Sequence, residues 1–205
     1  SAFIYGNDFY VENVTFENPA NKGQCVALYV EGDRAVFHRV SMLGNQDTLY
    51  TPGEGRQYYK NCYIEGTTDF IFGSATAVFE DCVLHSKNVR YITAASTPEH
   101  QPFGYLFINC RLTGDAEPDS VFLGRPWRPF AHVVFLNCWM GEHIKPIGWH
   151  NWKKPENEKT ARYAEYGSTG PGANDDGRAG WSRQLTKEEA DAITLEHVFA
   201  REDGW

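Results

Sequence analysis

The sequence predicts an all-β fold, a right-handed parallel β-helix whose C-terminal loops and short helix cover one end. One observation is composition. The chain has 205 residues, of which 41% are hydrophobic, with 19 glycines, 11 tyrosines and 13 phenylalanines. These residue types favour strands joined by many turns. The second observation is a short pattern that recurs along the chain: apolar residues, often an Asn or Asp, a small residue, then apolar residues again.

The repeat has a regular length. Its copies are centred on Asn13, Arg39, Asn61, Asp81, Asn109 and Asn137, and the steps between them are 26, 22, 20, 28 and 28 residues. A repeat of roughly 20 to 30 residues built from short strands indicates a solenoid, in which each coil buries its inward side chains against the next. A β-sandwich is the alternative, but a sandwich does not predict the regular Asn-Cys step.

Four of the five cysteines fall at one position of this repeat: Cys62, Cys82, Cys110 and Cys138. In successive coils they would stack inside, about 4.8 Å apart. One interpretation is a ladder of small buried side chains. The other is a disulfide between Cys62 and Cys82, because adjacent coils lie within the Cα range of a disulfide. No Cys-x-x-Cys or Cys-x-x-His pair is present, so the spacing predicts no zinc site.

The last third of the chain departs from the pattern. Residues 153–180 are rich in Lys, Glu, Gly, Pro and Asn and are expected to form long surface loops. Thr186-Lys187-Glu188-Glu189 is a capping box and predicts a short helix over about 187–193. No composition break marks a second domain, so residues 1–205 are expected to form one domain.

The net charge of -8 argues against nucleic acid or an anionic membrane as partner.

Two aspartates stand in apolar surroundings at equivalent places. Asp47 lies eight residues after Arg39, and Asp69 lies eight residues after Asn61. Stacked strands would bring them roughly 5 Å apart, and two carboxylates that close do not both ionise easily. One would then act as a nucleophile or base and the other as a proton donor. The alternative is two turn-forming aspartates that each accept a bond from a nearby backbone N–H.

Arg125 and Trp127 lie in Leu123-Gly124-Arg125-Pro126-Trp127, between two later repeats. An arginine supplies a permanent charge and a fork that fits a carboxylate. It would hold one aspartate ionised while the neighbour keeps a proton. Trp127 offers a flat apolar face of the kind that binds sugars. A surface salt bridge and a core tryptophan are the alternatives.

These residues resemble the signature blocks of the pectin methylesterase (pectinesterase) family. The three main blocks are Gln46-Asp47-Thr48-Leu49-Tyr50, Asp69-Phe70-Ile71-Phe72-Gly73 and Leu123-Gly124-Arg125-Pro126-Trp127. Gln24-Cys25-Val26-Ala27-Leu28 resembles a further block that carries a glutamine. Residues 148–152 and 163–173 are similar to the family's C-terminal portion, so the resemblance covers nearly the whole chain.

The resemblance implies an ester hydrolase that removes methyl groups from galacturonate residues. Asp69 would be the nucleophile and Asp47 the general acid and then base. Gln24 and Gln46 would form the oxyanion hole, and Arg125 would orient Asp69. The sugar site would be lined by Phe72, Trp127, Tyr50 and Thr68. No metal or other cofactor is implied.

The same resemblance implies the protein's setting. The partner would be methyl-esterified homogalacturonan (pectin), with no nucleic acid and no membrane, bound by a monomer. The enzyme would be secreted, extracellular or periplasmic, because pectin lies outside cells. Thr68 stands where Val is usual and Cys25 where Ala is common; neither change removes a catalytic group. Family catalytic domains are longer at the N-terminus, so we expect the chain to lack the N-terminal coils and cap.

Three other functions fit parts of the pattern. Carboxyl groups about 5 to 5.5 Å apart also suit a retaining glycosidase, but a glycosidase transition state builds no oxyanion for two glutamines to stabilise. A non-catalytic polysaccharide-binding solenoid would not need Asp47, Asp69 and Arg125 together. A calcium-dependent lyase would require an acidic cluster beyond the pair.

Overall fold

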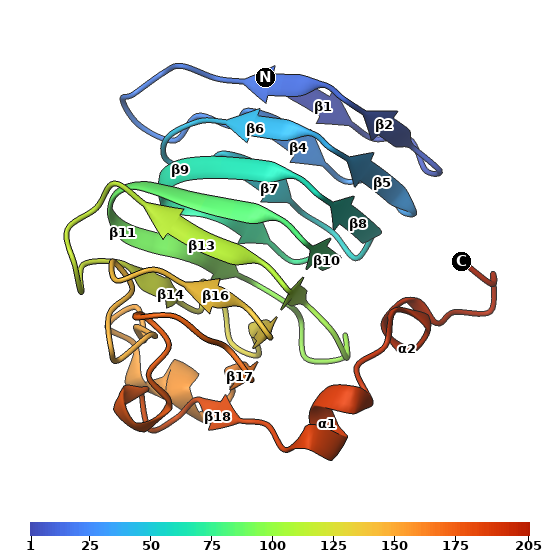
Figure 1. Ribbon diagram of the computed structural model, residues 1–205. Coiled ribbons are helices and arrows are strands. Elements are labelled where there is room, and N and C mark those ends of the chain that lie inside the picture. The colour runs from blue at the N-terminus through green and yellow to red at the C-terminus, as the bar shows by residue number, and fades with distance from the viewer.

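The chain is a parallel β-helix, seen in a computed structural model that describes residues 1–205 except the side chains of Val89 and Asp175. Successive coils stack from the N-terminal end to the C-terminal end (Figure 1). They form one sheet of 10 strands and one of 8 strands. Each strand pairing within the described residues is parallel, with its partner one coil away in the chain. The fold class predicted from the repeat is therefore confirmed.

The 8-stranded sheet carries the repeat. Its order is β18-β17-β15-β12-β10-β8-β5-β2. The strands are β2 (Tyr10–Glu12), β5 (Ala35–His38), β8 (Arg56–Lys60), β10 (Thr76–Glu80), β12 (Tyr105–Ile108), β15 (His132–Leu136), β17 (Arg162–Tyr166) and β18 (Arg183–Gln184).

The 10-stranded sheet carries two long strands that bend around the coil. These are β9 (Tyr63–Gly73) and β11 (Val83–Ala95). The first part of β9 pairs with β6 and its second part with β7. The remaining strands are β1 (Ala2–Ile4), β3 (Thr15–Glu17), β4 (Leu28–Val30), β6 (Ser41–Leu43), β7 (Leu49–Thr51), β13 (Arg111–Gly114), β14 (Phe122–Gly124) and β16 (Trp139–Met140).

The recurrent Asn or Asp is the corner between the two sheets. All six residues at this position have a positive φ, between 53° and 56°, including Asn61, Asp81 and Asn109. Asn and Asp adopt this left-handed backbone more readily than other non-glycine residues. The pattern read in the sequence is thus the turn that ends each strand of the 8-stranded sheet.

Aromatic rings fill the interior beside this turn. Phe37, Tyr59, Phe79, Phe107 and Phe135 occupy matching positions in β5, β8, β10, β12 and β15. Their ring centroids are 4.8, 4.6, 4.7 and 4.5 Å apart, and the rings are nearly parallel. All five are fully buried. The coil spacing sets the ring spacing, so each ring packs on the coil above and the coil below.

The cysteines after the turn form a ladder of free thiols. Cys82 Sγ contacts the carbonyls of Tyr59 and Glu80, both at 3.4 Å, and Cys110 Sγ contacts the carbonyl of Phe79 at 3.2 Å. The thiols therefore donate weak hydrogen bonds to backbone carbonyl groups at the corner of the coil. The Cys62–Cys82 disulfide that the spacing also allowed is not formed.

The C-terminal region contains more regular structure than its composition predicts. The stretch expected to be loops includes strand β17, which continues the 8-stranded sheet in register with β15, and the 3-10 helices η1 (Pro155–Lys159) and η2 (Asp175–Gly177). The prediction that residues 153–180 form only loops was therefore wrong. Backbone hydrogen bonds to β15 hold residues 162–166 in a strand although the segment is rich in turn-forming residues. The capping box at Thr186 is present and opens helix α1 (Lys187–Asp191), and a second helix, α2 (Leu195–Phe199), follows.

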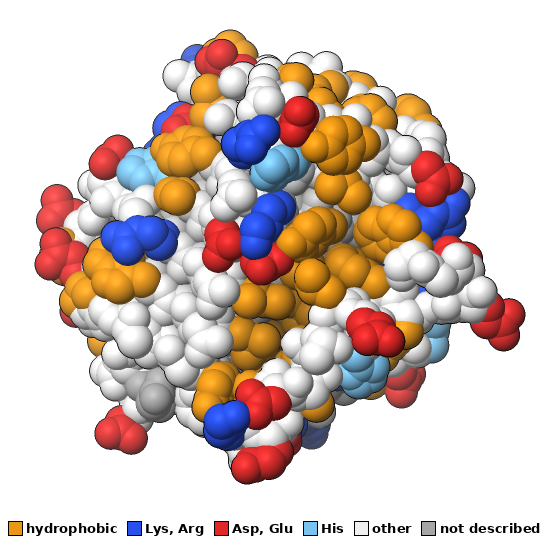
Figure 2. Space-filling model, turned by 45° about the vertical axis from the view of Figure 1, so that its right-hand side comes forward, with side chains coloured by type: hydrophobic (Ala, Val, Ile, Leu, Met, Phe, Trp, Pro, Cys, Tyr) orange, Lys and Arg blue, Asp and Glu red, His pale blue; other side chains and the backbone are white. Residues whose placement is uncertain are grey.

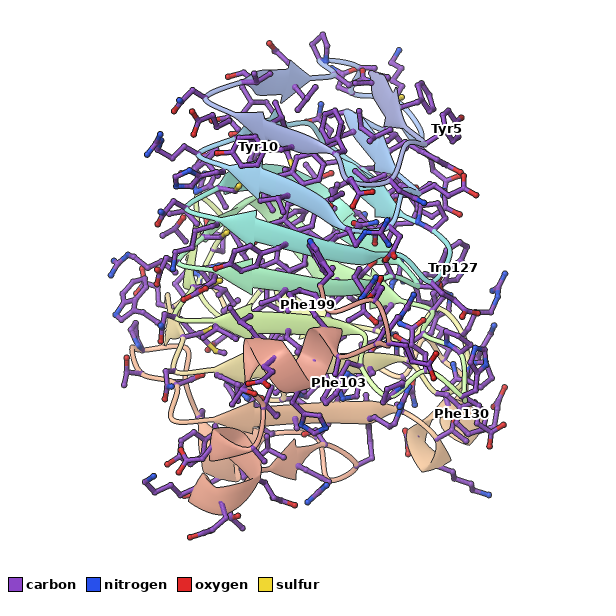
Figure 3. All side chains as sticks on the ribbon, turned by 90° about the vertical axis from the view of Figure 1, so that its right-hand side faces the viewer. Tyr5, Tyr10, Phe103, Trp127, Phe130 and Phe199 are labelled. Atoms are coloured by element: carbon purple, nitrogen blue, oxygen red, sulfur yellow. The ribbon has the colours of Figure 1, made fainter. Side chains whose placement is uncertain are left out.

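The two helices lie along the outer face of the 8-stranded sheet. Val198 and Phe199 pack with the outward side chains Val78, Leu106 and Val134. Figure 3 shows a helix of the tail in front of the sheet, with Phe199 and Phe103 labelled beside it and Trp127 towards the right-hand side of the view. Apolar side chains gather across the middle of the face turned forward in Figure 2. The tail thus shields an apolar sheet face from water.

A buried arginine anchors this tail. Arg56 is 1% exposed and donates to both carboxylate oxygens of Asp33 and to Asp203. It also donates to the Phe199 carbonyl at 3.0 Å, and its guanidinium lies 5.2 Å from the ring of Trp205. A buried guanidinium requires such partners on all sides.

The helices of the described residues are all too short to span a membrane.

The aromatic ladder yields a stability prediction. Phe79→Ala should lower the free energy of unfolding by about 3 to 5 kcal/mol, because it removes a fully buried ring that two neighbours contact. Phe79→Leu should cost clearly less. Denaturant unfolding followed by circular dichroism measures both, and equal losses for the two variants would contradict buried apolar volume as the source of this stability.

Candidate active site

The candidate site is built where three successive coils stack. The Cys25 N–H donates to the Gln46 carbonyl at 3.2 Å, and the Asp47 N–H donates to the Thr68 carbonyl at 3.0 Å. The strands that follow keep the same offset, with Leu49 beside Ile71. Asp47 and Asp69 therefore occupy the same place in neighbouring coils, as the repeat spacing predicts.

Both aspartates have a left-handed backbone, with φ of 65° at Asp47 and 49° at Asp69. Such a conformation costs free energy and persists only where the surroundings hold it. Glycines stand three residues before each aspartate. A Cβ on Gly44 would lie 2.5 Å from Thr48 Oγ1, and one on Gly66 would lie 2.2 Å from a side-chain atom of Phe70. These tight bends hold both aspartates at the rim of the coil.

Arg125 binds Asp69 with a two-pronged ion pair. Its Nε donates to Asp69 Oδ1 at 3.0 Å, and its Nη2 donates to Oδ2 at 2.6 Å. The side chains are 17% and 8% exposed, so water screens the pair little. Arg125 follows β14, which is paired with β11, and its own N–H donates to the Thr93 carbonyl at 3.0 Å.

This ion pair makes the two aspartates chemically different. Burial and then the negative charge of Asp69 raise the pKa of Asp47 to about 7, against the opposing effects of Arg125, Gln24 and Gln46. Burial also raises the pKa of Asp69, but the hydrogen bonds and charge of Arg125 oppose that rise. Asp69 is the acid that ionises first, and Asp47 keeps its proton up to near-neutral pH.

These groups surround one small pocket of about 150 Å³. It is lined by Gln24, Gln46, Asp47, Asp69, Phe72, Ala94, Arg125, Trp127 and Trp152. Seven of the nine site residues predicted from the sequence are among them. Tyr50 stacks flat on Phe72 with ring centroids 4.3 Å apart, and Thr68 lines an adjoining polar hollow that also includes Gln46.

Sequence reasoning assigned no role to Trp152, Ala94 or Tyr91. Trp152 and Ala94 line the pocket. The guanidinium carbon of Arg125 lies 3.5 Å from the ring centroid of Trp152 and 3.8 Å from that of Tyr91. Trp152 comes from the segment after the repeats, where no spacing relates it to Asp69, so the repeat could not place it here. The resemblance of residues 148–152 to the family's C-terminal portion was the one signal in the sequence, and it assigned Trp152 no role.

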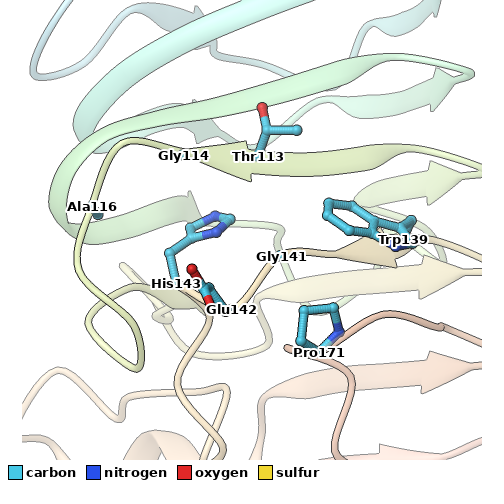
Figure 4. A pocket seen from close by; sticks show the side chains of 8 residues that line it. All are labelled: Thr113, Gly114, Ala116, Trp139, Gly141, Glu142, His143 and Pro171. Carbon is cyan, nitrogen blue, oxygen red and sulfur yellow. The ribbon is translucent and has the colours of Figure 1, made fainter.

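A different hollow lies beside β13 and β16 (Figure 4). It is lined by Thr113, Gly114, Ala116, Trp139, Gly141, Glu142, His143 and Pro171. Burial lowers the pKa of His143 to about 4, so the ring is neutral at physiological pH. Glu142 is the one acidic side chain in its lining, and the hollow therefore offers no carboxylate pair.

The fold and the site define a parallel β-helical protein with a paired-carboxylate centre, and comparison with known proteins gives the family. The Pectinesterase family model matches residues 1–202. Pectinesterase 31 of Arabidopsis thaliana is 46% identical over 193 residues, covering 93% of this chain and 61% of that protein. The chain belongs to the pectinesterase family.

Solved structures agree with this assignment. Pectin methylesterase from carrot superposes with a TM-score of 0.88 at 32% identity, covering 95% of this chain and 66% of that one. A mutant pectin methylesterase in complex with a hexasaccharide gives a TM-score of 0.83 at 33% identity, covering 97% of this chain and 72% of that one. The chain spans 55 to 61% of the length of the first curated relatives that it matches.

The electrostatic coupling of the pair is testable by titration. In Asp69→Asn the pKa of Asp47 should fall below about 7, because the neighbouring negative charge is gone, yet stay above its ordinary value because burial remains. Carbon-13 NMR of labelled aspartate carboxyl groups measures this shift. The surface variant Asp115→Asn serves as control. A pKa of Asp47 that does not move in Asp69→Asn would show that the two carboxyl groups do not interact.

Proposed function

We propose that this protein hydrolyses methyl esters of galacturonate residues in pectin, giving methanol and de-esterified pectin. The observation that carries the proposal is the unequal carboxyl pair. Arg125 binds Asp69 through two hydrogen bonds, and burial together with the charge of Asp69 raises the pKa of neighbouring Asp47 to about 7. A nucleophile and a proton donor side by side are the requirements for acyl transfer from an ester.

In the first step an oxygen of Asp69 attacks the carbonyl carbon of the methyl ester. Arg125 aligns the carboxylate through its two hydrogen bonds. The carbonyl oxygen gains negative charge, and we propose that the amide N–H groups of Gln24 and Gln46, which line the same pocket, stabilise it. Asp47 donates its proton to the departing methoxy oxygen, and methanol leaves.

The product of this step is an anhydride between Asp69 and the galacturonate carboxyl group. Asp47 is now ionised and takes a proton from a water molecule that attacks the galacturonate carbonyl carbon. The bond to Asp69 breaks, its electron pair returns to the Asp69 carboxylate, and the free acid is released. Every step uses groups of this chain and water.

The sugar chain is proposed to lie over the aromatic side chains beside the pocket. Phe72 and Trp127 line it, with ring centroids 6.0 Å apart, and Tyr50 extends the surface. Flat apolar rings fit sugar faces and a neutral methyl ester. Two similar pectin methylesterases were solved in complex with hexasaccharides, which supports an oligosaccharide ligand. We further propose that the protein acts as a monomer outside the cytoplasm, where pectin occurs.

The nucleophile has a direct test. Asp69→Asn should reduce methanol release from methylated pectin at least a thousandfold, because an amide oxygen cannot form the anhydride. The matched surface control is Asp115→Asn, which should keep full activity. Near-normal turnover by Asp69→Asn would refute the role of Asp69. New reducing ends without methanol, produced by the unmodified protein, would instead indicate a glycosidase.

The oxyanion donors predict a graded effect. Gln24→Ala should lower kcat by about 10² to 10³-fold and change KM little, because the lost hydrogen bond forms in the transition state. Asn21→Ala, in the adjoining polar hollow, is the control. Steady-state kinetics with methylated oligogalacturonides measure both. A raised KM with unchanged kcat in Gln24→Ala would assign Gln24 to substrate binding.

A further inference from the structure

The guanidinium of Arg125 is enclosed between two aromatic rings as well as paired with Asp69. Its central carbon lies 3.8 Å from the ring centroid of Tyr91 and 3.5 Å from that of Trp152. Two rings cannot both come within 4 Å of one carbon from the same side. The two rings therefore cover opposite faces of the guanidinium plane. Arginine stacks on ring faces, and the attraction strengthens where water is excluded.

Tyr91 is held in place by neighbouring coils. It lies in β11 opposite Phe122 of β14, the strand that leads directly to Arg125. The Tyr91 and Phe122 rings stack with centroids 5.2 Å apart at 14°. Tyr91 is absent from the lining of the catalytic pocket. Its ring contacts the site through Arg125, while its backbone is paired with Thr68, the residue before Asp69.

Trp152 is held by a strained loop. Trp152 and Lys153 both have a positive φ, 61° and 57°, which non-glycine residues adopt only at a cost in free energy. The Trp152 N–H donates to His150 Nδ1 at 3.1 Å, and the Lys153 N–H donates to Asn151 Oδ1 at 2.8 Å. These bonds maintain a bend that places the Trp152 ring over Arg125.

We propose that Tyr91 and Trp152 form an aromatic clamp that keeps Arg125 in position while Asp69 is acylated. The proposal rests on the proposed function. In the anhydride, Asp69 carries no charge, and the ion pair that holds Arg125 is lost. The two rings do not depend on that charge, so they continue to hold the guanidinium.

The clamp matters for the second half of the reaction. When water attacks the anhydride, the bond to Asp69 breaks and negative charge returns to the Asp69 carboxylate. A guanidinium already in place stabilises this charge as it forms, with no reorganisation. Tyr91 and Trp152 are therefore positioning residues for the hydrolysis of the intermediate. Trp152 also borders the pocket, so Tyr91 gives the cleaner test.

The kinetic test compares Tyr91→Leu, which removes the ring, with Tyr91→Phe, which keeps it. Tyr91→Leu should lower kcat about tenfold and KM by a similar factor, because a desolvated cation–ring contact is of that strength. The ratio kcat/KM should stay nearly unchanged, because the slowed step follows methanol release. Methanol leaves before the slowed step, so the variant should show a methanol burst equal to the amount of enzyme. Tyr91→Phe should restore kcat. Unchanged kcat in Tyr91→Leu, or an equal loss in Tyr91→Phe, would overturn the proposal.

A second measurement needs no activity. The NMR signal of the Arg125 Nε–H, assigned by its loss in Arg125→Lys, reports its exchange with water. In Asp69→Asn, which imitates the uncharged intermediate, exchange should stay slow while the clamp is intact. Adding Tyr91→Leu or Trp152→Leu should accelerate it at least tenfold, and Trp152→Phe should accelerate it less.

The two measurements separate the possible failures. If the unmodified protein releases no methanol, the proposed function fails, and the exchange measurement still decides the clamp. If exchange in the Asp69→Asn background is the same with and without Tyr91→Leu and Trp152→Leu, the clamp is refuted, whatever the enzyme activity. Circular dichroism of each variant confirms that the comparison is made on folded protein.

Discussion

The hydrogen-bond register between successive coils is the constraint on which the rest of this structure depends. It places Asp47 beside Asp69, Leu49 beside Ile71 and Phe79 between two other rings. A slip by one residue would turn the side chains of a strand to the opposite face. The left-handed corners at Asn61 and its equivalents end each strand at the same point and so maintain that register.

Backbone symmetry alone would make the two aspartates equivalent, and the proposed reaction requires that they differ. The difference comes from Arg125, which reaches Asp69 from a later part of the chain. Burial acts on both carboxyl groups, but only Asp69 has a guanidinium bound to both oxygens. The resulting charge on Asp69 in turn helps to keep Asp47 protonated. One long-range ion pair therefore converts a repeated position into a pair of unequal acids.

The segments after the repeats complete the site and the fold in different ways. The loop that carries Trp152 closes over Arg125 from one side of the coil. The tail with α1 and α2 covers apolar side chains of the 8-stranded sheet and ends at the buried Arg56. These contacts join segments that lie far apart in the chain, and none belongs to the periodic pattern.

The solenoid and the stacking of Asp47 on Asp69 could be predicted from the sequence alone, because periodic backbone pairing appears as a fixed spacing of residue types. Residue chemistry singled out Arg125 and Trp127, and resemblance to known signature blocks added Gln24, Gln46, Phe72, Tyr50 and Thr68. The three-dimensional structure was needed to show that the cysteines remain free thiols, that residues 162–166 pair with β15, and that Tyr91 and Trp152 enclose Arg125. Such contacts depend on where side chains of distant segments meet in space, and no local pattern encodes that meeting.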